Sequence, residues 1–206
     1  IMVRGDFSFH DTPLKDPACP PIVNIDVGPG PCTIIFDQQE FWEISLKSLA
    51  DKGCKRIAFL HNGIAGTHEE FLKKLNPLLN KYELSTAPHW VQACSAYNAD
   101  WSCNTMLLMM HKGQNERPDG LVIMDDNLTE WALEGVLRSG VSIPHELHIV
   151  THANFPAPPL KCKGIIQVGC DIDALLKMAI GFIERTKKGE NVPEVVTFSP
   201  IVHTVP

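Results

Sequence analysis

Most of the short apolar runs in this 206-residue chain are followed directly by polar side chains that could bind a small ligand. The residues in question are Asp26, His61, Asn62, Tyr97, Asp125, His152 and Asn154. Carboxylate, amide and imidazole groups supply hydrogen-bond donors and acceptors, and a tyrosine supplies an aromatic surface for stacking. Together they are typical of a site for a polar small molecule.

Helix capping is the simpler explanation for any single aspartate near these positions. Asp37 and Asp126 each stand just before a predicted helix, where aspartate is among the preferred N-cap residues. We therefore interpret Asp126 as an N-cap. Capping does not require Tyr97, His152 or Asn154, so the set as a whole still favours a binding site.

Catalytic and metal-binding alternatives find less support. Asp125 and Asp126 could hold Mg²⁺, but no third carboxylate or lysine follows a neighbouring strand. A GxxxxGK[ST] phosphate loop and a GxSxG nucleophile motif are both absent. The seven cysteines include no CxxC pair, and the cluster His145, His148 and His152 has no compact ligand spacing. We expect no catalytic residues, no cofactor and no bound metal.

The elements that must position these side chains alternate between apolar strands and amphipathic helices. Strands are predicted at Ile1–Val3, Pro21–Asp26, Thr33–Phe36, Arg56–Leu60, His89–Ala93, Gly120–Met124, Leu147–Thr151, Ile165–Val168 and Val195–Phe198, the last with a polar tail. Helices are predicted at Gln38–Lys52, Thr67–Tyr82, Asp100–His111, Leu128–Ser139 and Asp171–Lys188. This alternation predicts an α/β fold with a mainly parallel sheet and helices on both faces. In such sheets ligands bind beyond the carboxyl ends of the strands, where the polar side chains stand.

Composition narrows the class of protein. The 18 Lys and Arg against 24 Asp and Glu give a net charge of −6, which argues against nucleic-acid binding by this segment. No apolar run approaches the roughly 20 residues needed to span a bilayer. The cysteines are odd in number and scattered along the chain, which is typical of reduced thiols, so we expect a cytoplasmic location. The chain starts at Ile1 without signal-peptide features, and we interpret it as part of a longer protein.

The stretch Arg117–Asn154, RPDGLVIMDDNLTEWALEGVLRSGVSIPHELHIVTHAN, resembles the LacI/GalR family of sugar-responsive repressors. The family pattern there is PDA, an apolar strand, ND, a helix with ALRAL, a turn with G and VP, and ISVVGFDN. Here PDG, DD, the turn Gly140–Pro144 and LHIVTHAN follow in the same order. Other segments that resemble the family in order are Pro20–Asp26, Thr33–Asp37, Leu49–Leu60, Ile165–Val168 and Asp171–Lys188.

The resemblance implies a two-lobed, periplasmic-binding-protein-like (type I) α/β fold with parallel Rossmann-like sheets. It assigns residues 1–53 to an incomplete first lobe, joined by the helix 171–188. Residues 54–169 would form the second lobe, joined by residues 193–206. A DNA-binding headpiece, of the helix-turn-helix or winged-helix type, would lie outside this chain.

The resemblance also implies ligand contacts at Asp26, at Asp125 and near Tyr97. Two positions depart from the family: its ligand-binding arginine falls near Thr67, and the aspartate of GFDN falls on Ala153. Both changes remove a charged partner for the ligand. The neutral donors and acceptors that could substitute are His61, Asn62, His152 and Asn154.

We therefore expect the ligand-sensing domain of a LacI/GalR-like transcriptional regulator. A sugar or related small metabolite between the lobes would favour one closure, and closure would reposition a homodimer and its headpieces on DNA. No membrane contact is expected. The alternative is a solute-binding protein of a sugar transporter, against which the unpaired cysteines argue. An enzyme on the same fold is the third possibility.

Overall fold

The computed structural model describes residues 2–4, 19–26, 32–63, 68–156 and 162–204. The chain divides into two compact units. Unit 1 consists of Ile1–Gln38 and Cys170–Pro200, and unit 2 consists of Gln39–Gly169 and Ile201–Pro206.

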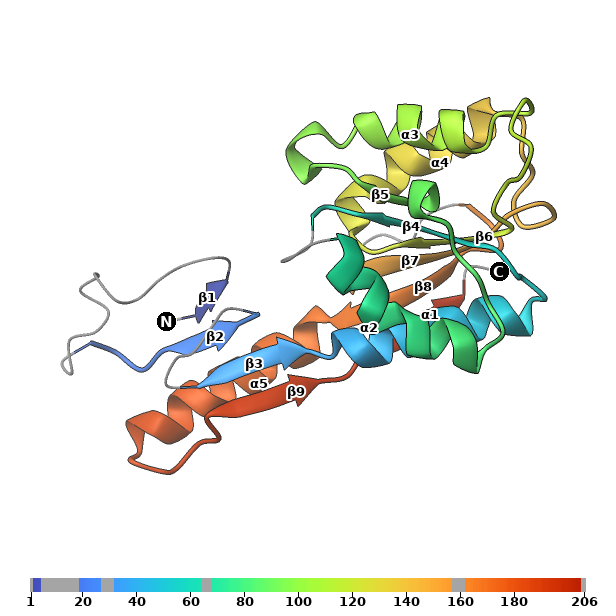
Figure 1. Cartoon of the computed structure of the whole chain (residues 1–206). Helices are drawn as coiled ribbons and strands as arrows, with labels where there is room; N and C mark the ends of the chain where they lie inside the picture. Colours follow the sequence, from blue (N-terminus) through green and yellow to red (C-terminus); the bar gives the residue numbers. More distant parts are fainter. Residues whose placement is uncertain (1, 5–18, 27–31, 64–67, 157–161, 205–206) are drawn as a thin grey trace. The chain divides into compact units, whose positions relative to one another are not determined.

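Unit 1 is a four-stranded parallel sheet packed against one long helix (Figure 1). The strands, in spatial order, are β1 (Met2–Arg4), β2 (Val23–Ile25), β3 (Thr33–Phe36) and β9 (Val195–Phe198). Apolar residues of β2 and β3 share a core with Leu175 and Ala179 of helix α5 (Ile172–Lys187). Asp171 caps this helix, because its carboxylate accepts a 2.9 Å hydrogen bond from the amide of Ala174.

Unit 2 holds a six-stranded sheet in the order β10-β8-β7-β6-β4-β5. The strands are β4 (Ile57–His61), β5 (Val91–Ala93), β6 (Gly120–Ile123), β7 (His148–Phe155), β8 (Ile166–Asp171) and β10 (Ile201–Thr204). Strands β5, β4, β6 and β7 are parallel, whereas β10 runs antiparallel to β8. The residues at the centre of the sheet are completely buried, as expected for parallel strands covered on both faces.

Two pairs of helices cover the two faces of this sheet (Figure 1). Helices α1 (Gln38–Asp51) and α2 (His68–Lys81) lie on one face, and α3 (Trp101–Met109) and α4 (Thr129–Arg138) lie on the other. Three short 3₁₀ turns lie between the strands and the helices: η3 (Pro88–Trp90), η4 (Ala96–Asn98) and η5 (Asp126–Leu128). The core between the sheet and the second pair contains Met106, Leu121, Ile123, Ala132 and Val136, all fully buried.

At two glycines of unit 2, a neighbouring backbone segment lies too close for any side chain to fit. A Cβ atom added to Gly135 would lie 2.2 Å from the carbonyl oxygen of Cys103, so α3 and α4 approach each other only because residue 135 has no side chain. A Cβ atom on Gly169 would lie 1.8 Å from the carbonyl oxygen of Ala153. The main chain of Ala153 therefore packs closely against β8.

The structure confirms the predicted α/β class, and the predicted strands and helices match with small shifts at their ends. Three differences stand out. The predicted polar tail contains β10, whose pairing with β8 makes the sheet mixed at its edge. The predicted strand His89–Ala93 begins as the turn η3. The assignment of segments to units also differs: α1 belongs with unit 2, and β9 belongs with unit 1 because it pairs with β3.

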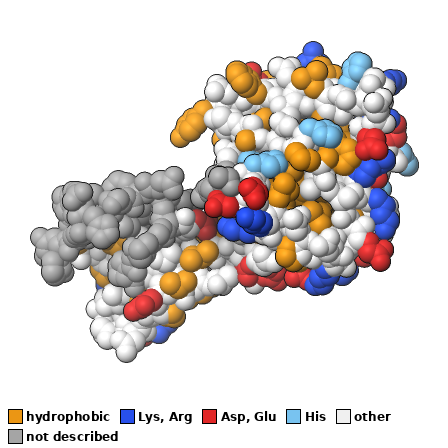
Figure 2. Space-filling model, in the orientation of Figure 1, with side chains coloured by type: hydrophobic (Ala, Val, Ile, Leu, Met, Phe, Trp, Pro, Cys, Tyr) orange, Lys and Arg blue, Asp and Glu red, His pale blue; other side chains and the backbone are white. Residues whose placement is uncertain are grey.

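Surface charge in unit 2 is mixed on the face drawn in Figure 2, where acidic and basic side chains alternate instead of forming one basic surface. Several of the basic side chains form ion pairs, such as Lys47 with Asp51 and Arg56 with Asp119. All seven cysteines are free thiols. Within the described residues, no helix combines the length and the apolar character needed to cross a membrane.

Candidate ligand-binding site

The carboxyl ends of β4, β6 and β7 meet at one edge of the unit 2 sheet. Leu60 of β4 pairs with Ile123 of β6, which pairs in turn with Thr151 of β7, and all three strands are parallel. Residues that follow these positions therefore emerge at the same edge. Five of the predicted ligand residues do so: His61, Asn62, Asp125, His152 and Asn154.

Asp125 connects two of these strand ends. One of its carboxylate oxygens accepts a hydrogen bond from the amide group of Asn62, which follows β4. The other accepts hydrogen bonds from the backbone and side-chain amides of Asn127, at 2.9 and 2.8 Å. Asp125 is consequently the N-cap of η5 and is also held by a residue 63 positions earlier.

Asp126 has a different role from the predicted one. We interpreted it as a helix N-cap, but α4 has Leu128 at its N-cap position and no side-chain capping bond. One oxygen of Asp126 instead accepts a 2.8 Å hydrogen bond from Asn154, and the other lies 3.9 Å from Nδ1 of His152. The nearby imidazole of His152 is the main cause that lowers the pKa of Asp126 below its usual value. Both partners belong to β7, so no local sequence signal identifies Asp126 as a site residue.

His61 is buried at the end of β4, with 4% of its surface exposed. Its Nδ1 accepts a 3.1 Å hydrogen bond from the amide of Gly63, and its ring lies 5.4 Å from that of Phe71. Burial lowers the pKa of His61, with a smaller contribution from the charge of His68. The imidazole is therefore neutral at neutral pH, and because Nδ1 is an acceptor, the proton is on Nε2.

The ring of His152 packs against helix α1. Its side chain is 16% exposed, and its ring makes an edge contact with Phe41 of α1 at 5.8 Å between centroids. The buried hydroxyl groups of Thr129 and Thr151 bond to each other at 2.6 Å beneath the same edge. The strand ends are thus joined by polar contacts between β7 and the start of α4.

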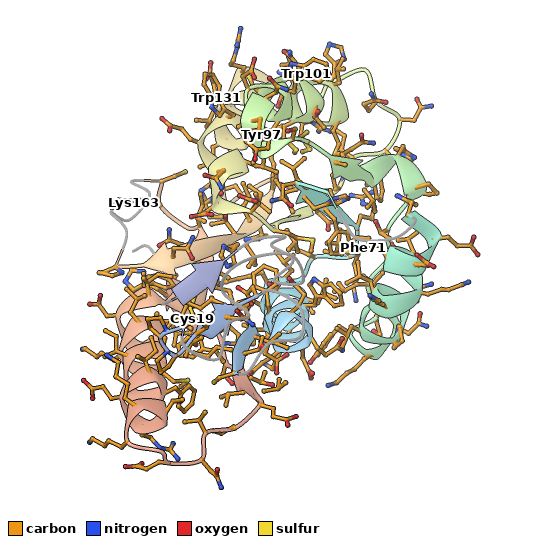
Figure 3. The ribbon with its side chains drawn as sticks, turned by 90° about the vertical axis from the view of Figure 1, so that its left-hand side faces the viewer. Cys19, Phe71, Tyr97, Trp101, Trp131 and Lys163 are labelled. Atoms are coloured by element: carbon orange, nitrogen blue, oxygen red, sulfur yellow. The ribbon has the colours of Figure 1, made fainter. Side chains whose placement is uncertain are left out.

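Tyr97, also in unit 2, does not join this cluster. The Tyr97 side chain is 99% exposed on η4, well separated from Phe71 on α2 (Figure 3). Asp26 lies in unit 1, where its carboxylate accepts a 2.7 Å hydrogen bond from the amide of Phe36 and its φ is +54°. It thereby closes the end of β2 against β3. Thr67 lies outside the described residues.

The charge of the assembled edge is negative. Asp125 and Asp126 stand side by side, and in the described part of the chain neither forms an ion pair with lysine or arginine. Among the same residues, no group of three or more His, Cys, Asp and Glu is arranged to hold a metal ion. Carboxylates fixed by amide groups can accept hydrogen bonds from ligand hydroxyls at their remaining lone pairs. The edge therefore suits a hydroxyl-rich ligand better than an anion.

Residues 46–204 match the family model described as "Periplasmic binding protein-like domain". No protein among the curated sequences matches significantly. Among solved structures, a LacI family transcriptional regulator from Arthrobacter sp. FB24, in complex with lactose, has a TM-score of 0.74 at 16% identity, covering 89% of this chain and 69% of the other.

A putative transcription regulator from Staphylococcus saprophyticus subsp. saprophyticus has a TM-score of 0.77 at 17% identity, over 99% of this chain and 76% of that one. A LacI family transcriptional regulator from Mycobacterium smegmatis has a TM-score of 0.69 at 21% identity, over 89% and 68%. At these identities the likeness establishes the fold, which is that of structures from the LacI family.

Proposed function

Because the chain belongs to the periplasmic binding protein-like domain family, we propose that it is the ligand-sensing domain of a LacI/GalR-like transcriptional regulator. Its ligand is a sugar or related small metabolite bound between two lobes. The protein is a cytoplasmic homodimer, and it contacts DNA only through a headpiece outside these 206 residues. It has no catalytic activity.

One observation carries this proposal: the Asn62–Asp125 and Asp126–Asn154 bonds fix two carboxylates at the carboxyl edge of the sheet. Side chains held in this way present acceptors at little further cost in conformational entropy when a ligand binds. His61 contributes an Nε2–H donor.

The mechanism is a shift of populations. A ligand that binds the closed arrangement better than the open one favours closure by its differential affinity. Closure changes how the two copies of the dimer orient their headpieces, so affinity for DNA changes without new DNA contacts in this chain. The net charge of −6 and the mixed surface of unit 2 are consistent with a segment that does not itself bind DNA.

A sugar transporter's solute-binding protein would use the same fold. The similar structures named above are of transcriptional regulators, and this favours regulation. The seven free cysteines also favour a reducing compartment over the periplasm. The sequence encoded upstream of Ile1 separates the two: a helix-turn-helix or winged helix supports the regulator, and a signal peptide contradicts it.

A thermal-shift screen against neutral sugars and sugar acids tests the ligand class. A ligand at 100 times its dissociation constant stabilises the folded state by roughly 2.7 kcal/mol. We expect neutral sugars to raise the melting temperature, and Asp125→Asn to reduce that response strongly. The matched control is Asp51→Asn, an exposed carboxylate at the end of α1. A full response in Asp125→Asn would show that the site is elsewhere, and no response to any sugar would contradict the proposed ligand.

A further inference from the structure

A cavity lies in unit 2 at the amino end of β5, away from the carboxyl edge that holds the candidate ligand site. Its volume is about 220 Å³. It is formed by η3 and β5, by the C-terminal half of α3 and by the loop that follows this helix. Its lining is His89, Trp90, Gln92, Thr105, Leu108, Met109, Gln114 and Glu116.

Two glutamines present acceptors in this cavity. The amide nitrogen of Gln92 donates to the carbonyl oxygen of His89 at 2.9 Å, and that of Gln114 donates to the carbonyl oxygen of Leu108 at 3.0 Å. Carbonyl oxygens accept and do not donate, so these bonds fix which end of each amide is the nitrogen. The Oε1 atoms of both glutamines remain as acceptors for a ligand.

Glu116 adds a negative charge to the same wall. Its side chain is exposed, and among the described residues it has no ion-pair partner. The neighbouring Arg117 points elsewhere, because its guanidinium donates to the carbonyl oxygen of Met110 at 3.4 Å. The cavity therefore combines one carboxylate with two amide oxygens.

Aromatic and apolar groups form the rest of the lining. Trp90 is buried, with 3% of its surface exposed, and the ring of His89 stands 5.3 Å from it at an interplanar angle of 63°. Leu108 is 66% exposed beside them. A short alkyl chain gains from contact with the exposed leucine.

We propose that this cavity binds a small organic cation with a guanidinium head and a short alkyl body. The planar head carries several N–H donors, which match the acceptors of Gln92, Gln114 and Glu116. The volume of about 220 Å³ is below the roughly 300 Å³ at which sites for drug-sized ligands begin, so only a small molecule fits. This site is independent of the sugar site, with which it shares no residue.

Titration of the whole chain with n-butylguanidinium, followed by NMR, tests the proposal. We expect saturable shifts of the side-chain amide signals of Gln92 and Gln114 and of the indole signal of Trp90. The neutral isostere n-butylurea should leave these signals unchanged, because the proposed recognition depends on the positive charge.

Variants distinguish binding in this cavity from non-specific attraction of a cation to an acidic protein. Glu116→Gln should weaken n-butylguanidinium binding by about threefold to fivefold, the upper part of the range expected for a solvent-exposed ion pair. Glu130→Gln, on the surface of α4, should leave the affinity unchanged. So should Asp125→Asn, whose effect belongs to the sugar site. Equal binding of n-butylurea, no shift of the three signals, or unchanged affinity in Glu116→Gln would each overturn the proposal.

Discussion

Asp126, the first residue of η5 after β6, accepts a 2.8 Å hydrogen bond from the side-chain amide of Asn154 on β7. The two residues are 28 positions apart in the sequence. Their bond joins neighbouring strand ends at the edge where parallel sheets bind ligands. It is therefore both a structural contact and part of the proposed sugar site.

Removing this bond should cost stability. We expect Asn154→Ala to lower the free energy of unfolding by about 1.5 to 3 kcal/mol, the range for a hydrogen bond to a charged group. A double-mutant cycle with Asp126→Asn, measured by urea denaturation, isolates the pair. Additive effects of the two substitutions would mean that the contact contributes nothing.

The lowered pKa of Asp126 predicts a dependence of stability on pH. The usual pKa of 3.8 applies in the unfolded chain, and the folded value is lower because of the nearby His152 imidazole and the hydrogen bond from Asn154. The contribution of Asp126 is thus complete above about pH 3.8 and is lost as pH falls through the folded pKa. Between pH 5 and 2.5, Asp126→Asn should show a smaller loss of unfolding free energy than the wild type. Parallel curves would contradict this assignment.

His61 predicts a second pH effect in a higher range. Burial lowers the pKa of His61 from its usual 6.5, so the unfolded chain binds the proton more readily than the folded chain does. Stability is therefore complete above pH 6.5 and declines as pH falls toward the folded pKa. Proton NMR should show the His61 ring still neutral somewhat below pH 6.5, where an ordinary imidazole is already charged. Protonation of His61 with a midpoint at or above 6.5 would contradict the burial argument.

Replacement of glycine by alanine should destabilise the protein at position 135 and stabilise it at position 181, because the space around the two glycines differs. Gly135→Ala places a methyl group 2.2 Å from the carbonyl oxygen of Cys103, and we expect a loss of roughly 1 to 3 kcal/mol through overpacking between α3 and α4. Gly181→Ala in α5 meets nothing within 4 Å and should gain about 0.5 to 1 kcal/mol from helix propensity. Thermal unfolding of both variants measures the contrast, which would disappear if the close approach of α3 and α4 were absent.

The types and order of the elements were predictable from local patterns. Apolar runs such as IAFL in β4 and GLVI in β6 are completely buried, because strands covered on both faces need no alternation. The helices follow the predicted periodicity, and α5 begins one residue later than predicted because Asp171 is its N-cap. β10 was not predicted, since its four residues are exposed and its identity as a strand depends on pairing with β8.

The candidate site was only partly predictable, because contacts between segments distant in the sequence decide which polar residues come together. Residue type and position after a strand pointed to Asp125, His152 and Asn154, and the structure brings these to one edge. The same reasoning assigned Asp126 to capping and treated Tyr97 and Asp26 as equal members of one set. Tyr97, which is 99% exposed, cannot be distinguished from a clustered residue by its neighbours in the sequence.

The sequence by itself therefore determined the α/β class, the order of strands and helices, and the polar character of the strand ends, since these depend on apolar periodicity and on residue type. The tertiary structure decided which polar groups are partners. Asp126 meets Asn154 and His152, and Asp125 meets Asn62, only because β4, β6 and β7 lie side by side in parallel register. Register is a relation between distant segments, and no single segment contains it.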